Sequence, residues 1–156
     1  MDCRREGGLS EDVGDVKGRT FSGQITHGLN NKPNKLLFRD VFLDTAQLAD
    51  IVKNMPGMDA SRVGACGGSQ GGSPALACAS LEPRNERLSS TFPFLCDYHR
   101  VWEMDLATNA YQELHDYFRL YDPLHKREDG IFTRPGYIDV ASLSARIRGR
   151  VRMVRG

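Results

Sequence analysis

The sequence lacks the features that specify membrane, secreted and metal-binding proteins. No apolar run is long enough to span a bilayer, and no hydrophobic stretch of the secretory type follows the first charged residues. Neither C-x-x-C spacing nor any other His, Cys, Asp or Glu pattern typical of a metal site occurs. The cysteines are Cys3, Cys66, Cys78 and Cys96. We therefore expect a cytoplasmic protein without metal or cofactor, in which Cys66 and Cys78 are small core residues.

The chain also lacks a charge bias, because 21 basic and 20 acidic residues leave a formal net charge of +1. Such a chain has no general attraction to nucleic acid or to an anionic membrane. A run of arginines lies near the end, at Arg146, Arg148, Arg150, Arg152 and Arg155. It is a candidate phosphate or nucleic-acid patch, but one short patch on a near-neutral chain favours a solvated helix end. We expect neither nucleic acid nor membrane as a partner.

The 156 residues, 40% of them apolar, suffice for one domain with a core. Residues 1–35 are polar and glycine-rich, which predicts a loop region without core periodicity. A helix is predicted next, because apolar residues then recur at helical spacing until Pro56 and Gly57 end it. Its expected buried stripe contains Leu37, Val41, Leu48, Val52 and Met55.

Short apolar segments alternate with helical ones in the rest of the chain. Asp59 is a candidate cap before a buried strand at Arg62–Cys66, and further strands are predicted at Leu88–Phe92 and Arg150–Val154. This alternation predicts an α/β fold with a parallel sheet. Three strands leave open edges and a small core, so we expect an incomplete parallel sheet that is part of a larger fold.

Most of the aromatic residues lie between Leu95 and Tyr121, with helical spacing at 107–120. We interpret 95–135 as a helical, lid-like insertion, although for most of these aromatics an ordinary amphipathic core helix is the more economical explanation. Asp139 is expected to cap a helix that runs to Ile147 and ends before Gly149.

The motif with the clearest chemistry is G-x-S-x-G at Gly67-Gly68-Ser69-Gln70-Gly71. It lies between the predicted strand and a small, apolar helical segment at Ser73–Leu81, which is the setting of a nucleophile elbow with Ser69 as nucleophile. Gly67 and Gly71 are expected to be glycine because a Cβ would collide with the neighbouring strand or helix. A phosphate-binding glycine turn is the alternative, but no Lys-Ser/Thr pair follows, which excludes a Walker loop.

The histidines offer Ser69 no obvious partner. Asp97 and His99 have the right chain order for a triad, but residues two apart point in different directions. His115 has Asp116 beside it and is poorly placed as well. His125 follows a turn and is expected to pack or bond locally, and His27 lies in the glycine-rich region. A structural or surface role is expected for each of them.

The run Gly67–Gly72 resembles the elbow of the acetyl xylan esterase and cephalosporin-C deacetylase family, carbohydrate esterase family seven. Other stretches resemble that family in the same order, so the likeness covers nearly the whole chain. These stretches are 7–14, 43–49, 77–83, 92–98, 100–102, 111–113, 116–119 and 136–140.

The resemblance implies a partial α/β-hydrolase fold, a Ser-His-Asp triad, and removal of acetyl groups from short xylo-oligosaccharides and cephalosporin C. It implies an intracellular homo-oligomer, a ring-like hexamer in the family. Ser69 matches the nucleophile, and the backbone N–H of Gln70 matches one oxyanion-hole donor.

The same comparison implies that parts are missing. Met1–Arg4 resembles an internal stretch of the family, and the tyrosine whose N–H completes the oxyanion hole has no counterpart. Val151–Gly156 resembles the strand before the catalytic aspartate, so the catalytic Asp and His are expected to be absent from this chain. Arg152 and Arg155 stand where the family has apolar residues. We therefore expect a truncated, inactive fragment; a non-catalytic interaction module or another α/β-hydrolase, such as a serine peptidase, are the alternatives.

Overall fold

The central element is a parallel sheet, seen in a computed structural model that describes residues 25–105 and 111–154. Its order is β1-β2-β3, with β1 at Gly64–Gly68, β2 at Arg87–Thr91 and β3 at Arg150–Val154. Gly68 pairs with Thr91, and Thr91 pairs with Val154, so the strands end together at their carboxyl edge. The predicted parallel α/β sheet is confirmed.

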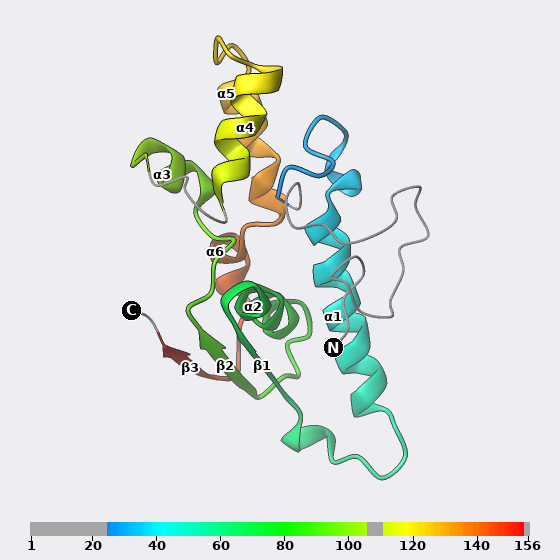
Figure 1. Cartoon of the computed structure of the whole chain (residues 1–156). Coiled ribbons are helices and arrows are strands. Elements are labelled where there is room, and N and C mark those ends of the chain that lie inside the picture. Colours follow the sequence, from blue (N-terminus) through cyan, green and yellow to red (C-terminus); the bar gives the residue numbers. More distant parts are fainter. Residues whose placement is uncertain (1–24, 106–110, 155–156) are drawn as a thin grey trace.

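Helix α2, at Gly72–Leu81, is the element around which the others pack (Figure 1). It contacts β1 and β2 on one side, and it also contacts α1 at Leu37–Lys53 and α6 at Val140–Ser144. Every residue from Gly72 to Ser80 is buried. The small side chains of this helix explain how it fits among so many neighbours, because they let adjacent elements approach closely.

A second group of helices lies beyond α6 and consists of α3 at Tyr98–Glu103, α4 at Gln112–Tyr121 and α5 at Glu128–Thr133 (Figure 1). Trp102 joins them, with ring centroids 4.6 Å from Phe118 and 6.0 Å from Phe132. These three aromatics form a small core of the group, as the simpler explanation of the aromatic segment expects. The lid-like role of 95–135 stays a prediction, and 106–110 lie outside the described residues.

The buried face of α1 differs from the predicted stripe. Leu37 and Val41 are buried as expected, but Leu48 is exposed, and Met55 is exposed and lies beyond the end of the helix. The buried set is Leu37, Phe38, Val41, Phe42, Thr45, Ala49 and Lys53. The prediction missed Thr45 and Lys53 because it scored apolar residues only.

The segment before α1 contributes to the core, against the expectation of a loop without core residues. Ile25 and Leu29 are 2% and 0% exposed and belong to the same cluster as the buried face of α1. The N–H of Leu37 donates to the carbonyl of His27 at 3.3 Å, which ties the turn to the start of the helix. Residues 1–24 of the predicted loop lie outside the described part of the chain.

The expected buried strand at Arg62–Cys66 is wrong in bounds and in burial. Arg62 belongs to a 3-10 helix at Ala60–Arg62, and exposed residues alternate with half-buried ones along β1. Among the described residues α2 covers one face of the sheet, and the register places Cys66 on the other. Cys66 is exposed, so its expected place in the core is wrong, whereas Cys78 is buried as expected.

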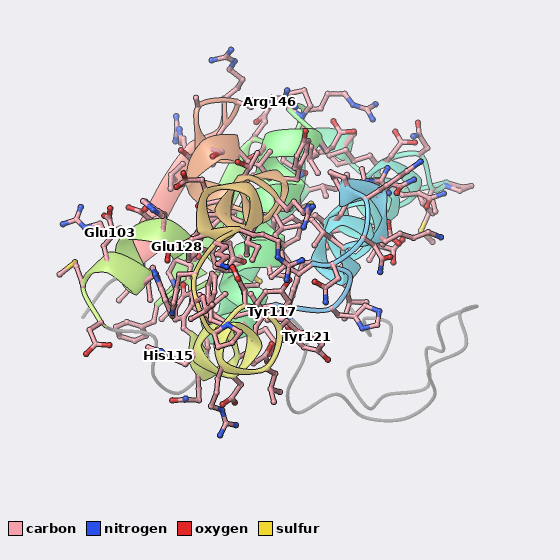
Figure 2. All side chains as sticks on the ribbon, turned by 90° about the horizontal axis from the view of Figure 1, so that it is seen from above. Glu103, His115, Tyr117, Tyr121, Glu128 and Arg146 are labelled. Atoms are coloured by element: carbon pink, nitrogen blue, oxygen red, sulfur yellow. The ribbon has the colours of Figure 1, made fainter. Side chains whose placement is uncertain are left out.

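The arginine run is solvated, as the simpler interpretation expects. Arg146, Arg148, Arg150 and Arg152 are all exposed, and Arg155 lies outside the described residues. Figure 2 shows Arg146 at the opposite end of the view from α4, which carries His115 and Tyr117. The register places Arg150 and Arg152 beside Arg87 and Ser89 on the uncovered sheet face. Within the described ranges, no helix combines the length and apolarity needed to cross a membrane.

Two of the predicted caps are present. The carboxylate of Asp59 accepts from the N–H of Ser61 at 3.0 Å, and that of Asp139 accepts from Ala141 at 2.9 Å. The helix after Asp139 ends at Ser144, earlier than the predicted Ile147.

Glu82 ends α2 and forms the best-defined ion pair of the described residues. Its side chain is 10% exposed and accepts from Arg84, with Nε at 2.8 Å and Nη2 at 2.7 Å. Arg84 also contacts Asp50 of α1. The hydrogen bonds from Arg84 outweigh the effect of burial and hold the pKa of Glu82 at about 2, below its ordinary 4.5.

We predict that Glu82→Gln lowers the free energy of unfolding at pH 7 by about 1–3 kcal/mol, because the stabilising charge is lost. The folded-state pKa is depressed, so this stabilisation is complete above pH 4.5 and disappears as the pH falls towards 2. Urea unfolding at several pH values measures the difference. Glu86→Gln is the control, since Glu86 is exposed and its substitution should change stability little. An equal difference at pH 3 and pH 7 would contradict the assignment.

Candidate active site

Ser69 occupies a sharp turn between β1 and α2. It directly follows β1, opens a 3-10 helix at Ser69–Gly71, and has a left-handed backbone with a φ of 51°. Such a conformation is uncommon for a residue with a Cβ and is often found where function requires it. Ser69 is exposed. The predicted order of strand, turn and helix is present, while the nucleophilic role of Ser69 stays a prediction.

The close contacts of the turn fall on different glycines from those expected. A Cβ on Gly67 would lie 2.0 Å from the carbonyl oxygen of Gly71, so the turn itself excludes any side chain there. A Cβ on Gly71 would have no described atom within 4 Å, so the expected collision at Gly71 is wrong. Gly72 is the crowded position instead, because its Cβ would lie 2.9 Å from Ser90 Oγ and 3.0 Å from Pro93 Cα.

Gln70 lies at the amino end of the helical segment that Ser69 opens. The peptide dipoles of a helix make its amino end favourable for negative charge. The arrangement suits the stabilisation of an oxyanion, the role predicted for the N–H of Gln70, which stays a prediction.

Sequence reasoning missed the neighbouring segment, Phe92–Asp97, which follows β2. Phe92, Leu95 and Asp97 have φ values of 45°, 68° and 50°. Ser69 and Phe92 directly follow the paired residues Gly68 and Thr91 at the carboxyl edge of the sheet. The signal available in the sequence was Pro93, which ends the strand, but nothing in the pattern predicts left-handed residues around it.

Tyr111 fastens this segment to α4. Its hydroxyl accepts from the N–H of Leu95 at 2.9 Å and lies 3.3 Å from both the N–H and the carbonyl oxygen of Cys96. Burial raises the pKa of Tyr111 to about 12, so the hydroxyl keeps its proton at neutral pH and remains a donor.

Three histidines lie in the helical group and have local partners. His99 Nδ1 is 3.5 Å from Glu103, His115 Nε2 is 3.7 Å from Asp105, and His125 Nδ1 is 2.9 Å from Glu128. Figure 2 shows Glu103, His115 and Glu128 on one side of the molecule. No contact joins any of these three histidines to Ser69 within the described residues. His125 also stacks on Phe118 at 5.0 Å, which fits the expected local packing.

The candidate triad pair Asp97 and His99 is not brought to Ser69. Asp97 donates its N–H to Asp139 at 2.9 Å, and no contact between the side chains of Asp97 and His99 is present in the described part of the chain. No cluster of three metal-ligating side chains occurs among the described residues either. Nucleophilic attack by Ser69 therefore stays a prediction, without a contact to any of these three histidines in the described part of the chain.

Comparison with known proteins identifies this arrangement. The sequence model of the acetyl xylan esterase (AXE1) family matches residues 1–156. Acetyl xylan esterase 1 from Thermoanaerobacterium sp. JW/SL YS485 has 58% sequence identity and a TM-score of 0.92 over 98% of this chain. The acetyl xylan esterase from Paenibacillus sp. R4 has 35% identity and a TM-score of 0.87 over 97% of this chain. This chain covers 48% of each solved structure.

A curated relative is more distant. The acetyl esterase Axe7A from Xylanibacter ruminicola is 32% identical over 76 residues, which is 49% of this chain and 17% of that protein. The chain thus spans about half the length of the solved relatives and a smaller share of the curated one.

We predict that Gly72→Ala destabilises the protein by about 1–3 kcal/mol, because the added methyl group overpacks the contact with Ser90 and Pro93. Gly71→Ala is the matched control, since both glycines have helical backbone angles and only Gly72 is crowded. The control should be neutral or slightly stabilising, because alanine favours helix. Thermal unfolding of both variants measures the effect, and equal melting temperatures would contradict it.

Proposed function

This chain belongs to the acetyl xylan esterase family, and we propose that Ser69 is the nucleophile of a carboxylic ester hydrolase acting on acetylated saccharides. The observation that carries the proposal is the left-handed, exposed Ser69 between the end of β1 and the start of α2. A hydroxyl held there meets a substrate from solvent and lies at the positive end of a helical segment.

The reaction follows the chemistry of serine esterases. Ser69 Oγ attacks the acetyl carbonyl carbon while its proton passes to a histidine, and the N–H of Gln70 with a second backbone N–H holds the oxyanion. The sugar leaves as the alcohol after accepting that proton. Water then releases acetate from the acetyl-serine by the same steps in reverse order.

We propose that none of the histidines of this chain supplies the base. His99, His115 and His125 are engaged with carboxylates of the helical group. The aspartate that would orient the base is likewise proposed to be absent from this chain, since no contact joins the side chains of the candidate pair Asp97 and His99 within the described residues. On this proposal the chain carries the nucleophile and one oxyanion donor, and the catalytic histidine and aspartate are not among its residues.

The substrate range and assembly complete the proposal. We propose short acetylated xylo-oligosaccharides as substrates, in keeping with the two solved relatives named as acetyl xylan esterases. Cephalosporin C, a cytoplasmic location and a hexameric homo-oligomer are proposed on the family resemblance alone. Neither a metal nor a cofactor is required by this chemistry.

A small fluorophosphonate is expected to label Ser69, and labelling should accelerate with added imidazole. Ser69 is exposed, so a base from solution can take its proton. Peptide mapping by mass spectrometry identifies the labelled serine. Ser69→Ala should abolish labelling, whereas Ser61→Ala, which removes an exposed serine at the other end of β1, should leave it unchanged. Labelling that survives Ser69→Ala would remove the basis of the proposal.

Turnover by the 156-residue chain alone should be lower than that of the Thermoanaerobacterium relative by up to about 10⁶-fold, the loss measured when triad members are removed. Acetate release from acetylated xylotriose measures it for both proteins. Replacing all four histidines, His27, His99, His115 and His125, together by glutamine should leave the residual rate unchanged. A rate equal to that of the relative, or loss of the residual rate in this quadruple variant, would show that this chain does contain the base.

A further inference from the structure

Phe92 combines a left-handed backbone with an exposed aromatic side chain in the described part of the chain. Its backbone is left-handed, with a φ of 45°, and its side chain is 54% exposed. A large aromatic residue in this region of backbone space is an outlier, and burial of the ring does not offset the strain. The ring makes no aromatic contact with the described residues, whereas Phe94, two positions later, packs on Tyr111 at 6.0 Å.

The position of Phe92 is fixed by its neighbours. Its N–H donates to the carbonyl of Val154 at 2.8 Å, and the adjacent Pro93 lies against Gly72 at the start of α2. Further along, Tyr111 holds the N–H of Leu95, and Asp139 holds the N–H of Asp97. Contacts with β3 and with the helices therefore fix the backbone of Phe92 and of the segment that follows it. A binding residue that is fixed before the ligand arrives is preorganised in this way.

Phe92 also lies at the sheet edge that carries the proposed nucleophile. Gly68 and Thr91 are paired at the carboxyl edge of the sheet, and Ser69 and Phe92 are the residues that follow them. Ligands of parallel α/β sheets bind at this edge. The ring of Phe92 is open to solvent at this place. An open surface can bind a large group such as a sugar ring, whereas an acetyl methyl group requires a small, enclosed pocket.

We propose that Phe92 is the platform on which a sugar ring of the acetylated substrate packs while its ester is at Ser69. The face of a xylose ring that carries C–H groups provides the apolar surface that an aromatic ring binds. The proposal deepens the esterase function and depends on it for the position of the ester. Phe92 positions the saccharide and takes no part in bond making or breaking.

The test compares Phe92→Gly with wild-type Phe92, in both cases in a Ser69→Ala background that prevents hydrolysis. Ligand-observed NMR titration with acetylated xylotriose gives the dissociation constant. The constant should rise about threefold to tenfold in Phe92→Gly, the loss expected for one aromatic contact. The melting temperature should rise, because glycine adopts the left-handed backbone without strain. If Phe92 were needed only for the fold, Phe92→Gly would not raise the melting temperature and weaken sugar binding at the same time.

Two further variants control the test. Phe92→Tyr keeps the ring and should bind like the parent, and Tyr137→Ala removes a ring that is 60% exposed but lies in the 3-10 helix at Pro135–Tyr137. Binding that is undetectable in the parent, unchanged in Phe92→Gly, or equally weakened in Tyr137→Ala would overturn the platform.

Fluorophosphonate labelling separates this proposal from the esterase function. With Ser69 present, Phe92→Gly should be labelled at the parent rate, because Phe92 holds the sugar and not the nucleophile. A parallel loss of labelling would overturn the platform, since Phe92 would then act through the turn at Ser69. Failure to label Ser69 in the parent, with sugar binding still dependent on Phe92, would reject the esterase function and leave the platform supported.

Discussion

The site depends on how closely the start of α2 approaches the ends of β1 and β2. The carbonyl of Gly71 occupies the space that a side chain on Gly67 would need, and Ser90 and Pro93 occupy the space next to Gly72. Ser90 Oγ also donates to the carbonyl of Gly72 at 3.2 Å, which ties β2 to the first turn of the helix. Ser69 lies between these crowded glycines and has a left-handed backbone, with a φ of 51°.

The same approach connects the turn at Ser69 to distant parts of the chain. Pro93 belongs to the segment that Tyr111 and Asp139 hold, and Val140, next to Asp139, donates its N–H to the carbonyl of Leu95 at 3.3 Å. The segments after β2 thus hold the residues that directly follow this strand at the edge of the sheet. Contacts of this kind can persist while exposed surface residues vary.

The sequence predicts the local elements well because each has a signal of its own. The G-x-S-x-G motif, the cap residues Asp59 and Asp139, and the alternation of strands and helices identify the parallel sheet and the turn at Ser69. Burial was predicted less well, since Cys66 faces an uncovered side of β1 and Lys53 is buried in α1. Whether a neighbour covers an apolar segment is a property of the assembled chain, which periodicity does not contain.

Close contacts are the other property that local patterns miss. The motif includes Gly71 and predicts a close contact there. The position of β2 and of Pro93 instead places Ser90 and Pro93 against Gly72. Phe92 is likewise held by contacts between distant segments, because its N–H donates to Val154 and the adjacent Pro93 lies against Gly72. Ser69 and Phe92 both have a left-handed backbone and an exposed side chain, and each directly follows a strand that ends at this edge. Such backbone conformations are concentrated at functional sites, and these two residues are the ones that the proposed function uses there.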